Sequence, residues 1–313
     1  MIETPVPELR RTRTPVRNMK AAGHPNRDLG PALILIGPGT ILFIVFVAIP
    51  IIGGLLLSFF SWNLVGFPQW VGLDNFVRLF QDPLVGKSLL NTAGFVVLGV
   101  VPTVILGLML AVFINVRMRG IAVLRTLYLI PAVVSFAASA VLWRWIYNPT
   151  NGLLNFVLGW FGIDEKAWVT ETATALPSLV IVGIWLSLPI SILFYLAALQ
   201  RIPESVIEAA MLDGASAFQR LTRIIWPLVL PMTLLVVLVD FIHFANGSFD
   251  LVSLMTQGGP VNATTTLVYY MYTTAFQNLD LGYAAALGLA QLAFIVGCLV
   301  LVQLGRKAIG SRW

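Results

Sequence analysis

The sequence predicts an all-α membrane protein with six transmembrane helices, and three observations support this fold class. First, 58% of the residues are hydrophobic and 11% are charged, whereas a soluble domain carries about 25% charged residues. Second, six apolar runs reach the roughly 20 residues that a helix needs to cross a bilayer. Third, Lys and Arg are distributed unevenly between the segments that join these runs, as the positive-inside rule requires.

The N-terminal segment, residues 1–30, is polar and holds six of the nineteen Lys and Arg residues. We expect it to be a disordered cytoplasmic tail. Arg10 and Arg11 raise the alternative of a twin-arginine signal. However, the apolar run from Pro31 to about Phe60 is too long for a signal peptide and lacks a small-residue cleavage site. We therefore expect a retained first span.

Residues 31–313 are expected to form one transmembrane domain. Fifteen Lys and Arg residues fall on the side that holds both termini and the loop 201–223, and four fall on the other side. This asymmetry predicts cytoplasmic termini and explains the net charge of +5 without a nucleic-acid partner. The spans are expected at about 32–60, 88–116, 121–147, 177–199, 224–246 and 283–305.

The loop 201–223 is exceptional because it carries six charges between two long apolar runs. Pro203 suits the first position of a helix, where no backbone N–H is needed. Apolar residues then recur at helical spacing, and Gly214 can adopt the left-handed conformation that ends a helix. A second helix is expected to begin near Ser216 and to continue into the next span. The pattern predicts helix–glycine–helix at a membrane surface.

This loop resembles the EAA loop of ABC importer permeases, in which the first helix docks on a separate ATPase subunit. The departure is Trp226, where the family usually has Leu, and the position is apolar either way. The residues that carry the resemblance are Glu208, Ala209, Ala210, Asp213 and Gly214, followed by Ile224, Trp226 and Pro227.

Further segments resemble carbohydrate-type permeases of this family, such as those for maltose and glycerol phosphate. They follow one another in the family's order and cover nearly the whole chain after residue 30. These segments are Val71–Phe76, Leu90–Thr92, Pro131–Pro149, Gly152–Asn155, Phe249–Leu251, Thr256–Pro260 and Asp280–Ala286.

The resemblance implies the six-span bundle of a type I ABC importer permease, in a bacterial-type cell membrane, with a cytoplasmic coupling helix. It implies that Glu208, Ala209, Ala210, Asp213 and Gly214 couple the chain to its ATPase. The implied partners are a second permease subunit, in a heterodimer, a dimeric ATP-binding cassette subunit and an extracytoplasmic solute-binding protein. The chain itself then needs no cofactor, because ATP and Mg²⁺ are bound by the partner subunits.

The sequence offers no chemistry for ATP hydrolysis in this chain. Gly86-Lys87-Ser88 matches the end of a Walker A motif, but the required preceding glycine is Gln81. No catalytic or metal-binding set can be assembled, and Cys298 is the only cysteine. We therefore expect a protein that is not an enzyme.

Five polar or aromatic residues inside the spans are candidates for the substrate pathway: Asp240, His243, Asn246, Gln291 and Trp185. An ionisable residue in a span usually faces a bundle interior or an aqueous cavity. Asp240 is therefore interpreted either as lining the cavity or as an interhelical pair with Arg144 or His243. Trp185 suits stacking on a sugar but also helix packing, and Gln291 suits an interhelical hydrogen bond.

The expected function is the uptake of a sugar or oligosaccharide delivered by the solute-binding protein. A glycerol phosphoester is the alternative substrate, although such an anion favours Lys or Arg at mid-depth and no span centre offers one. An ion-coupled secondary transporter or channel is a less favoured alternative, because it predicts broken helices in paired halves and leaves the EAA loop unexplained. A membrane enzyme is the weakest alternative.

Overall fold

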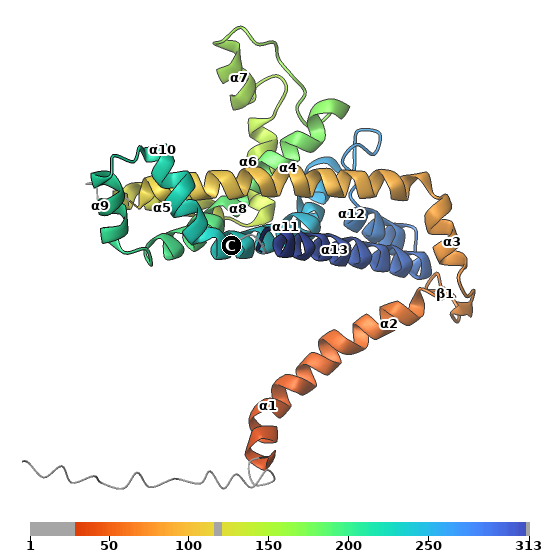
Figure 1. Ribbon diagram of the computed structural model, residues 1–313. Helices are drawn as coiled ribbons and strands as arrows, with labels where there is room; N and C mark the ends of the chain where they lie inside the picture. Colours follow the sequence, from red (N-terminus) through yellow and green to blue (C-terminus); the bar gives the residue numbers. More distant parts are fainter. Residues whose placement is uncertain (1–28, 116–120, 311–313) are drawn as a thin grey trace, which may run out of the picture. The chain divides into compact units, whose positions relative to one another are not determined.

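The computed structural model describes residues 29–115 and 121–310, and their regular structure is almost entirely helical (Figure 1). The predicted disordered tail lies almost wholly outside the described residues. The chain divides into two compact units, with the boundary between Ile52 and Gly53. The first span consists of α1 (Leu29–Phe43), a π-helical turn η1 (Ile44–Ala48) and α2 (Ile49–Leu57).

The second unit begins at Gly53, within α2, and continues with a short antiparallel pair, β1 (Phe60–Ser61) and β2 (Gln69–Trp70), in which Phe60 is opposite Trp70. The helices and π-helical turns that follow are α3 (Asp74–Gln81), α4 (Pro83–Ile114), α5 (Ile121–Val133), α6 (Phe136–Ile146), α7 (Leu153–Gly159), α8 (Thr172–Leu199), α9 (Glu204–Leu212), α10 (Ala217–Arg220), η2 (Leu221–Ile225), α11 (Trp226–Leu251), η3 (Val252–Thr256), α12 (Leu267–Tyr272), η4 (Thr273–Gln277) and α13 (Leu281–Gly310).

Five helical segments in the described residues are long and apolar enough to cross a membrane: Ile34–Leu57, Pro83–Ile114, Thr172–Leu199, Ala217–Thr256 and Leu281–Leu301. They correspond to five of the six predicted spans. The predicted span 121–147 differs, because α5 and α6 meet at an angle of 111°. The break consists of Val134 and Ser135, shortly after Pro131. The Ser135 hydroxyl accepts a hydrogen bond from the Ala138 N–H and so starts a new helix. Among the described residues, a sixth span is present only if α5 and α6 together cross the membrane as one bent segment.

The core of the second unit lies where α4, α8 and α11 pack together. Phe244 of α11 is 1% exposed, and its ring occupies the space that side chains at Gly99 and Gly183 would need. The two glycines therefore let α4 and α8 approach α11 closely. This packing fixes the rotation of α11, which carries three of the five candidate pathway residues.

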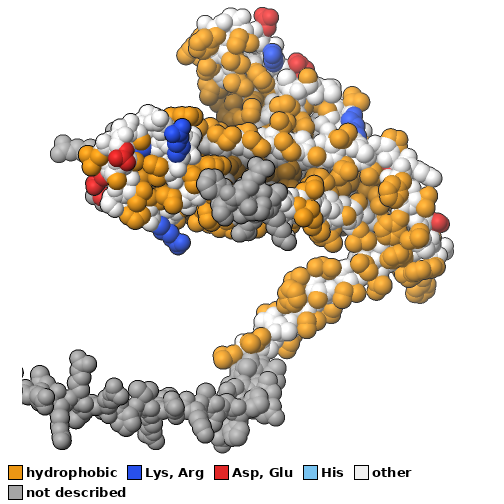
Figure 2. All heavy atoms as spheres, viewed as in Figure 1, with side chains coloured by type: hydrophobic (Ala, Val, Ile, Leu, Met, Phe, Trp, Pro, Cys, Tyr) orange, Lys and Arg blue, Asp and Glu red, His pale blue; other side chains and the backbone are white. Residues whose placement is uncertain are grey.

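The hydrophobic surface is continuous over much of the visible face, and charged side chains gather around α9 and α10 and on the arm that carries α7 (Figure 2). No residue in the most apolar window of the first span is buried. Both observations fit helices whose outer surface meets lipid. Lipid tails are as apolar as a leucine side chain, so an apolar side chain that faces them carries no hydrophobic penalty.

Candidate functional site

The first candidate site is the loop between α8 and α11. Its first helix, α9, begins at Glu204, with Pro203 as the residue before it rather than as the first helical position. The helix ends as predicted, because Gly214 has a φ of 77°. The Gly214 N–H donates to the Met211 carbonyl at 3.1 Å, and the Ala215 N–H donates to the Ala210 carbonyl at 3.0 Å. These two bonds form a Schellman motif, the usual glycine-dependent helix stop.

The second helix of the loop begins with a capping box. The Ser216 hydroxyl accepts from the Gln219 N–H at 3.2 Å, and the Gln219 side chain accepts from the Ser216 N–H at 2.8 Å. From there α10, η2 and α11 follow without an interruption. The second helix of the loop is therefore continuous with the long helix α11, as the sequence predicted.

The loop presents an exposed surface that contains both charged and apolar side chains. Glu208, Ala209 and Asp213 are exposed, whereas Ala210 is 7% exposed and packs inward. Leu212 and Phe218 are 89% and 74% exposed. A cavity of about 260 Å³ lies beside α9, lined by Glu204, Glu208, Met211 and Ile207 together with the ends of α4 and α8 and part of η2. Exposed leucine and phenylalanine beside carboxylates suit a surface that binds another protein.

Asp240 is 2% exposed, on the side of α11 that faces α8. Its two carboxylate oxygens accept hydrogen bonds from the Ser191 hydroxyl at 2.9 and 3.2 Å. Among the described residues the hydrogen-bond partner is thus Ser191, rather than the Arg144 or His243 that the sequence suggested. Ser191 lies close to α4, since a side chain at Gly107 would approach it to 3.1 Å.

Gln291 is 6% exposed and joins α13 to α11, because its side-chain amide donates to the Ala245 carbonyl at 3.4 Å. Its amide oxygen has no hydrogen-bond partner among the described residues. The hydrogen bond to Ala245 is the interhelical contact predicted for Gln291, and the amide oxygen of Gln291 can still accept a hydrogen bond from another donor.

The other three candidates lie toward α6 or the surface. The His243 ring stacks on Phe136 with the centroids 6.0 Å apart, and Trp185 meets Trp143 edge-on at 5.8 Å. Asn246 is exposed, and its amide donates to the Ile242 carbonyl of its own helix at 3.2 Å. The structure thus separates the five candidates into two buried residues that join helices and three that are partly or fully accessible.

A polar seam at the end of the bundle opposite α9 was not predicted from any sequence pattern. We use "polar seam" for the contacts of Arg78, Asp82, Lys87 and Asn91 with residues 261–283. Arg78 pairs with Asp280 at 2.6 Å, and its guanidinium lies 3.8 Å from the centre of the Tyr283 ring. Asp82 accepts from the hydroxyls of Tyr270 and Tyr283 at 2.6 and 2.7 Å.

The polar seam continues along the first turns of α4. The Lys87 ammonium donates to the Val261 carbonyl at 2.5 Å. The Asn91 amide donates to the carbonyls of Asn262 and Thr265 at 3.0 and 2.9 Å. Figure 1 shows residues 257–266 as a pale blue loop near α4. These contacts fasten the segment between α11 and α13 to the start of α4.

The groups of the polar seam shift one another's pKa values. Burial alone raises the pKa of the Asp82 carboxyl, but the hydroxyls of Tyr270 and Tyr283 outweigh it, so the pKa falls below its usual 3.8. Burial also lowers the pKa of Arg78, and the Asp280 carboxylate more than compensates. Burial and the Asp82 carboxylate raise the pKa of Tyr270 to about 12. These groups therefore keep their charge states across the physiological pH range.

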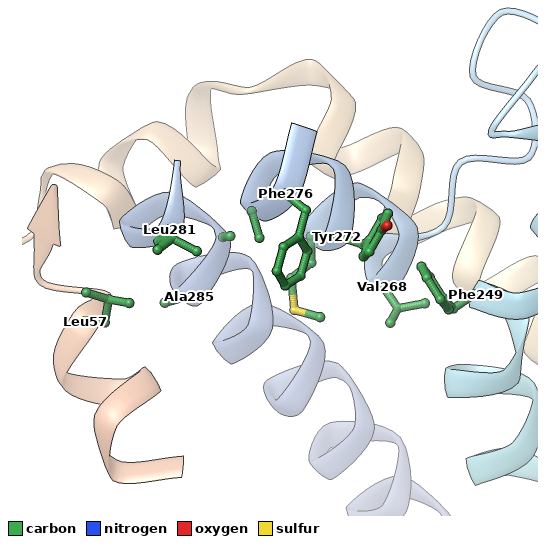
Figure 3. Close-up of a pocket in the computed structure, with 10 residues that line it drawn as sticks. Leu57, Phe249, Val268, Tyr272, Phe276, Leu281 and Ala285 are labelled. Atoms are coloured by element: carbon green, nitrogen blue, oxygen red, sulfur yellow. The ribbon is translucent and has the colours of Figure 1, made fainter. Parts of the chain in front are cut away.

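A cavity of about 400 Å³ lies among α12, η4 and α13 (Figure 3). Its walls are apolar, with Tyr272 as the only hydroxyl in the lining. Sugars and phosphates need several hydrogen-bonding groups in a site, so this cavity does not suit them. The lining residues are Leu57, Phe249, Val268, Met271, Tyr272, Ala275, Phe276, Leu281, Ala284 and Ala285.

Comparisons with known proteins agree with this arrangement. The profile of the family described as binding-protein-dependent transport system inner membrane component matches residues 95–312. The sn-glycerol-3-phosphate transport system permease protein UgpA of Shigella flexneri is 36% identical over 271 residues, which are 86% of this chain and 91% of that protein.

Two crystal structures share the fold. A bacterial ABC transporter involved in the import of the acidic polysaccharide alginate contains a chain with a TM-score of 0.76 and 26% identity, with 90% of this chain and 96% of that one covered. The alginate transporter in complex with its pentasaccharide-bound periplasmic protein gives a TM-score of 0.73 at 26% identity, with 86% and 92% covered.

Proposed function

Because the chain belongs to the family of binding-protein-dependent transport system inner membrane components and is thus an ABC importer permease subunit, we propose that it couples ATP hydrolysis on a separate subunit to the uptake of a neutral sugar or oligosaccharide. The observation that carries the proposal is the loop between α8 and α11. It combines an exposed helix, a glycine stop and an unbroken connection into α11. A displacement of α9 is therefore passed through the short Gly214 turn and α10 to the helix that carries Asp240, His243 and Asn246.

The residues proposed to couple the chain to its ATPase are Glu208, Ala209, Ala210, Asp213 and Gly214. The exposed Glu208 offers a charge-assisted hydrogen bond to a basic residue of the partner. Ala209 lets a partner approach the helix backbone, while the buried Ala210 holds α9 against the membrane domain. Asp213 and Gly214 end the helix. The two exposed apolar residues Leu212 and Phe218 enlarge the contact.

The proposed partners are a second permease subunit, a dimeric ATPase that binds ATP and Mg²⁺, and a solute-binding protein on the external side. The chain lies in the inner membrane. We propose that both its termini and α9 face the cytoplasm, since fifteen of nineteen Lys and Arg residues fall on that side. The polar seam then lies on the external side.

A neutral substrate is favoured by the charges within the spans. In the described residues 83–114, 172–199, 226–251 and 281–301, the only Lys or Arg is Lys87, in the second turn of α4. The bent pair α5–α6 adds Arg125 in its first helix and Arg144 in the last turn of its second, so neither lies at the middle of a straight span. An anion crossing the membrane domain needs a compensating cation at mid-depth. A glycerol phosphoester remains the second candidate because the UgpA relative is named for glycerol 3-phosphate, and it requires that the partner subunit supply the cation.

For the substrate pathway, the geometry supports different roles for the five candidates. We assign Asp240 and Gln291 to holding α11 against α8 and α13, because both are buried and hydrogen-bonded between helices. We assign Trp185, His243 and Asn246 to the pathway, since they remain accessible in part. An aromatic ring and an amide are the groups that bind the apolar face and the hydroxyls of a sugar.

The test is uptake by the whole complex in proteoliposomes with ATP inside and loaded binding protein outside. Radiolabelled neutral oligosaccharides are compared with glycerol 3-phosphate. Uptake of a neutral sugar alone supports the proposal, and uptake of glycerol 3-phosphate alone overturns the substrate assignment. Asn246→Ala should reduce uptake or change the preferred sugar, while Asp240→Asn, which retains an acceptor for Ser191, should transport normally. Impaired uptake by an Asp240→Asn complex that still assembles would mean that Asp240 lines the substrate pathway rather than only holding α11 against α8.

A further inference from the structure

The arm between α6 and α8 turns an apolar face away from the rest of the bundle. Leu153, Phe156 and Trp160 follow the i, i+3, i+7 spacing of one helix face. All three are exposed, Phe156 to 62% and Trp160 to 72%, and the exposed Phe161 follows them. The Phe156 and Trp160 rings meet edge-on, with their centroids 5.2 Å apart. Figure 2 shows the arm standing clear of the bundle. A contiguous apolar patch of this kind indicates a partner.

The direction of this face is fixed from the inner side of α7 by Asn155, which is buried. The Asn155 amide donates to the carbonyls of Pro149 and Lys166, each at 2.9 Å. Its amide oxygen accepts from the indole N–H of Trp168 at 2.7 Å. Because these bonds join α7 to the chain on both sides of it, the arm is an ordered unit, and the opposite side of α7 is held outward.

The level of the arm in the membrane follows from α8. This helix has 28 residues and ends at Leu199, two positions before the charged Arg201. Since about 20 residues cross the hydrocarbon core, about eight at the start of α8 reach beyond it, and Ser178 is among the last of these. The Ser178 carbonyl accepts from the Tyr147 hydroxyl, and the Ser178 hydroxyl donates to the Trp168 carbonyl, both at 3.1 Å. The arm is therefore fastened to α8 at the edge of the core, on the membrane side away from α9.

We propose that Leu153, Phe156, Trp160 and Phe161 form an interfacial anchor, which lies among the lipid headgroups and upper acyl chains of the leaflet away from α9. Tryptophan is enriched at this level of a membrane because its ring is amphipathic. Trp, Phe and Leu also form the buried face of helices that lie in the interface. The anchor carries no charge, whereas the exposed Asp164 follows it and can stay in water. The inference concerns the lipid contact and does not depend on the substrate.

The experiment measures how often nitroxide spin labels collide with oxygen, which is concentrated in lipid, and with a water-soluble nickel chelate. The complete transporter is placed in vesicles of phosphatidylethanolamine and phosphatidylglycerol. Single labels are attached at Phe156→Cys, Trp160→Cys and Phe161→Cys, after Cys298→Ser and removal of the cysteines of the partner subunits. The matched control is Asp164→Cys on the same arm. We expect the ratio of oxygen to nickel collisions to be several-fold higher at the three anchor positions than at the control.

The same ratio with and without loaded binding protein would support the anchor, and three other results would overturn it. Frequent nickel collisions at the anchor positions would place the face in water. Infrequent collisions with both reagents, together with an immobile label, would assign the face to the second permease subunit. A loss of collisions only after loaded binding protein is added would assign it to that protein. If one variant fails to assemble, the two others decide between these outcomes.

Discussion

Replacing Gly214 by valine tests whether the glycine stop of α9 is required for coupling. Gly214 has a φ of 77°, and a Cβ placed there meets no other atom within 4 Å. The cost is therefore confined to the backbone, about 1–2 kcal/mol for an L residue in the left-handed region. Since 1.4 kcal/mol is a factor of ten, the native turn should become roughly 5- to 30-fold less populated relative to alternatives.

The destabilisation of this turn should extend to the whole of α9. The helix has nine residues, and helices shorter than about 12 residues are marginal without outside support. The Schellman bonds to the carbonyls of Ala210 and Met211 depend on the conformation of Gly214. We therefore expect Gly214→Val to insert and assemble normally, but to lose the stimulation of ATPase activity by loaded binding protein.

The assay is ATP hydrolysis by the purified complex in lipid, with and without loaded binding protein. Gly214→Asn is the matched control, because asparagine tolerates the left-handed conformation and should retain most of the stimulation. If Gly214→Val is stimulated as strongly as the wild type, the shape of this turn is irrelevant to coupling and the role assigned to the loop is wrong.

Three further predictions address the topology, the polar seam and the core. Reporter fusions at Asp164 should report an external position and fusions at Gly214 a cytoplasmic one; the reverse result would refute the assigned orientation. Asp82→Asn should lower the apparent Tm at pH 7. Because the pKa of Asp82 is lowered in the folded protein, its stabilisation is fully present above pH 3.8 and is lost as the pH falls through the folded pKa, so the two Tm values should converge in acid. Gly99→Ala should cost about 1–3 kcal/mol by overpacking against Phe244, and Gly99→Ala with Phe244→Leu should recover part of the lost Tm.

The spans and the helix–glycine–helix loop could be predicted because their signals are local. Apolar length marks a span, and Gly214 marks a helix end, whatever the rest of the chain does. The starts of α4 and α8 lie about five residues earlier than predicted, at Pro83 and Thr172. In α4 the reason is that Asp82 accepts from the Leu84 N–H and caps the helix, which extends it beyond the apolar run.

The contacts between distant segments could not be predicted in the same way. The bend between α5 and α6 depends on a capping serine whose role is indistinguishable in sequence from that of other serines in the spans. The partner of Asp240 is Ser191, 49 residues away, and a serine in an apolar helix gives no pattern that identifies its partner. The polar seam likewise joins residues whose proximity is created only by the completed bundle.

The polar seam also constrains the order of events during synthesis. Its pairs are separated by 171 to 202 residues, so none can form until the later partner has left the ribosome. At about 5–20 residues per second, the polar groups at the start of α4 wait roughly 10–40 s for their partners. During this time water can form hydrogen bonds with these groups at the end of the helix. Leaving the same groups unpaired in hydrocarbon would cost free energy. The second span can therefore enter the membrane early, and the seam closes as one of the last steps of biogenesis, once α12 and the start of α13 have arrived.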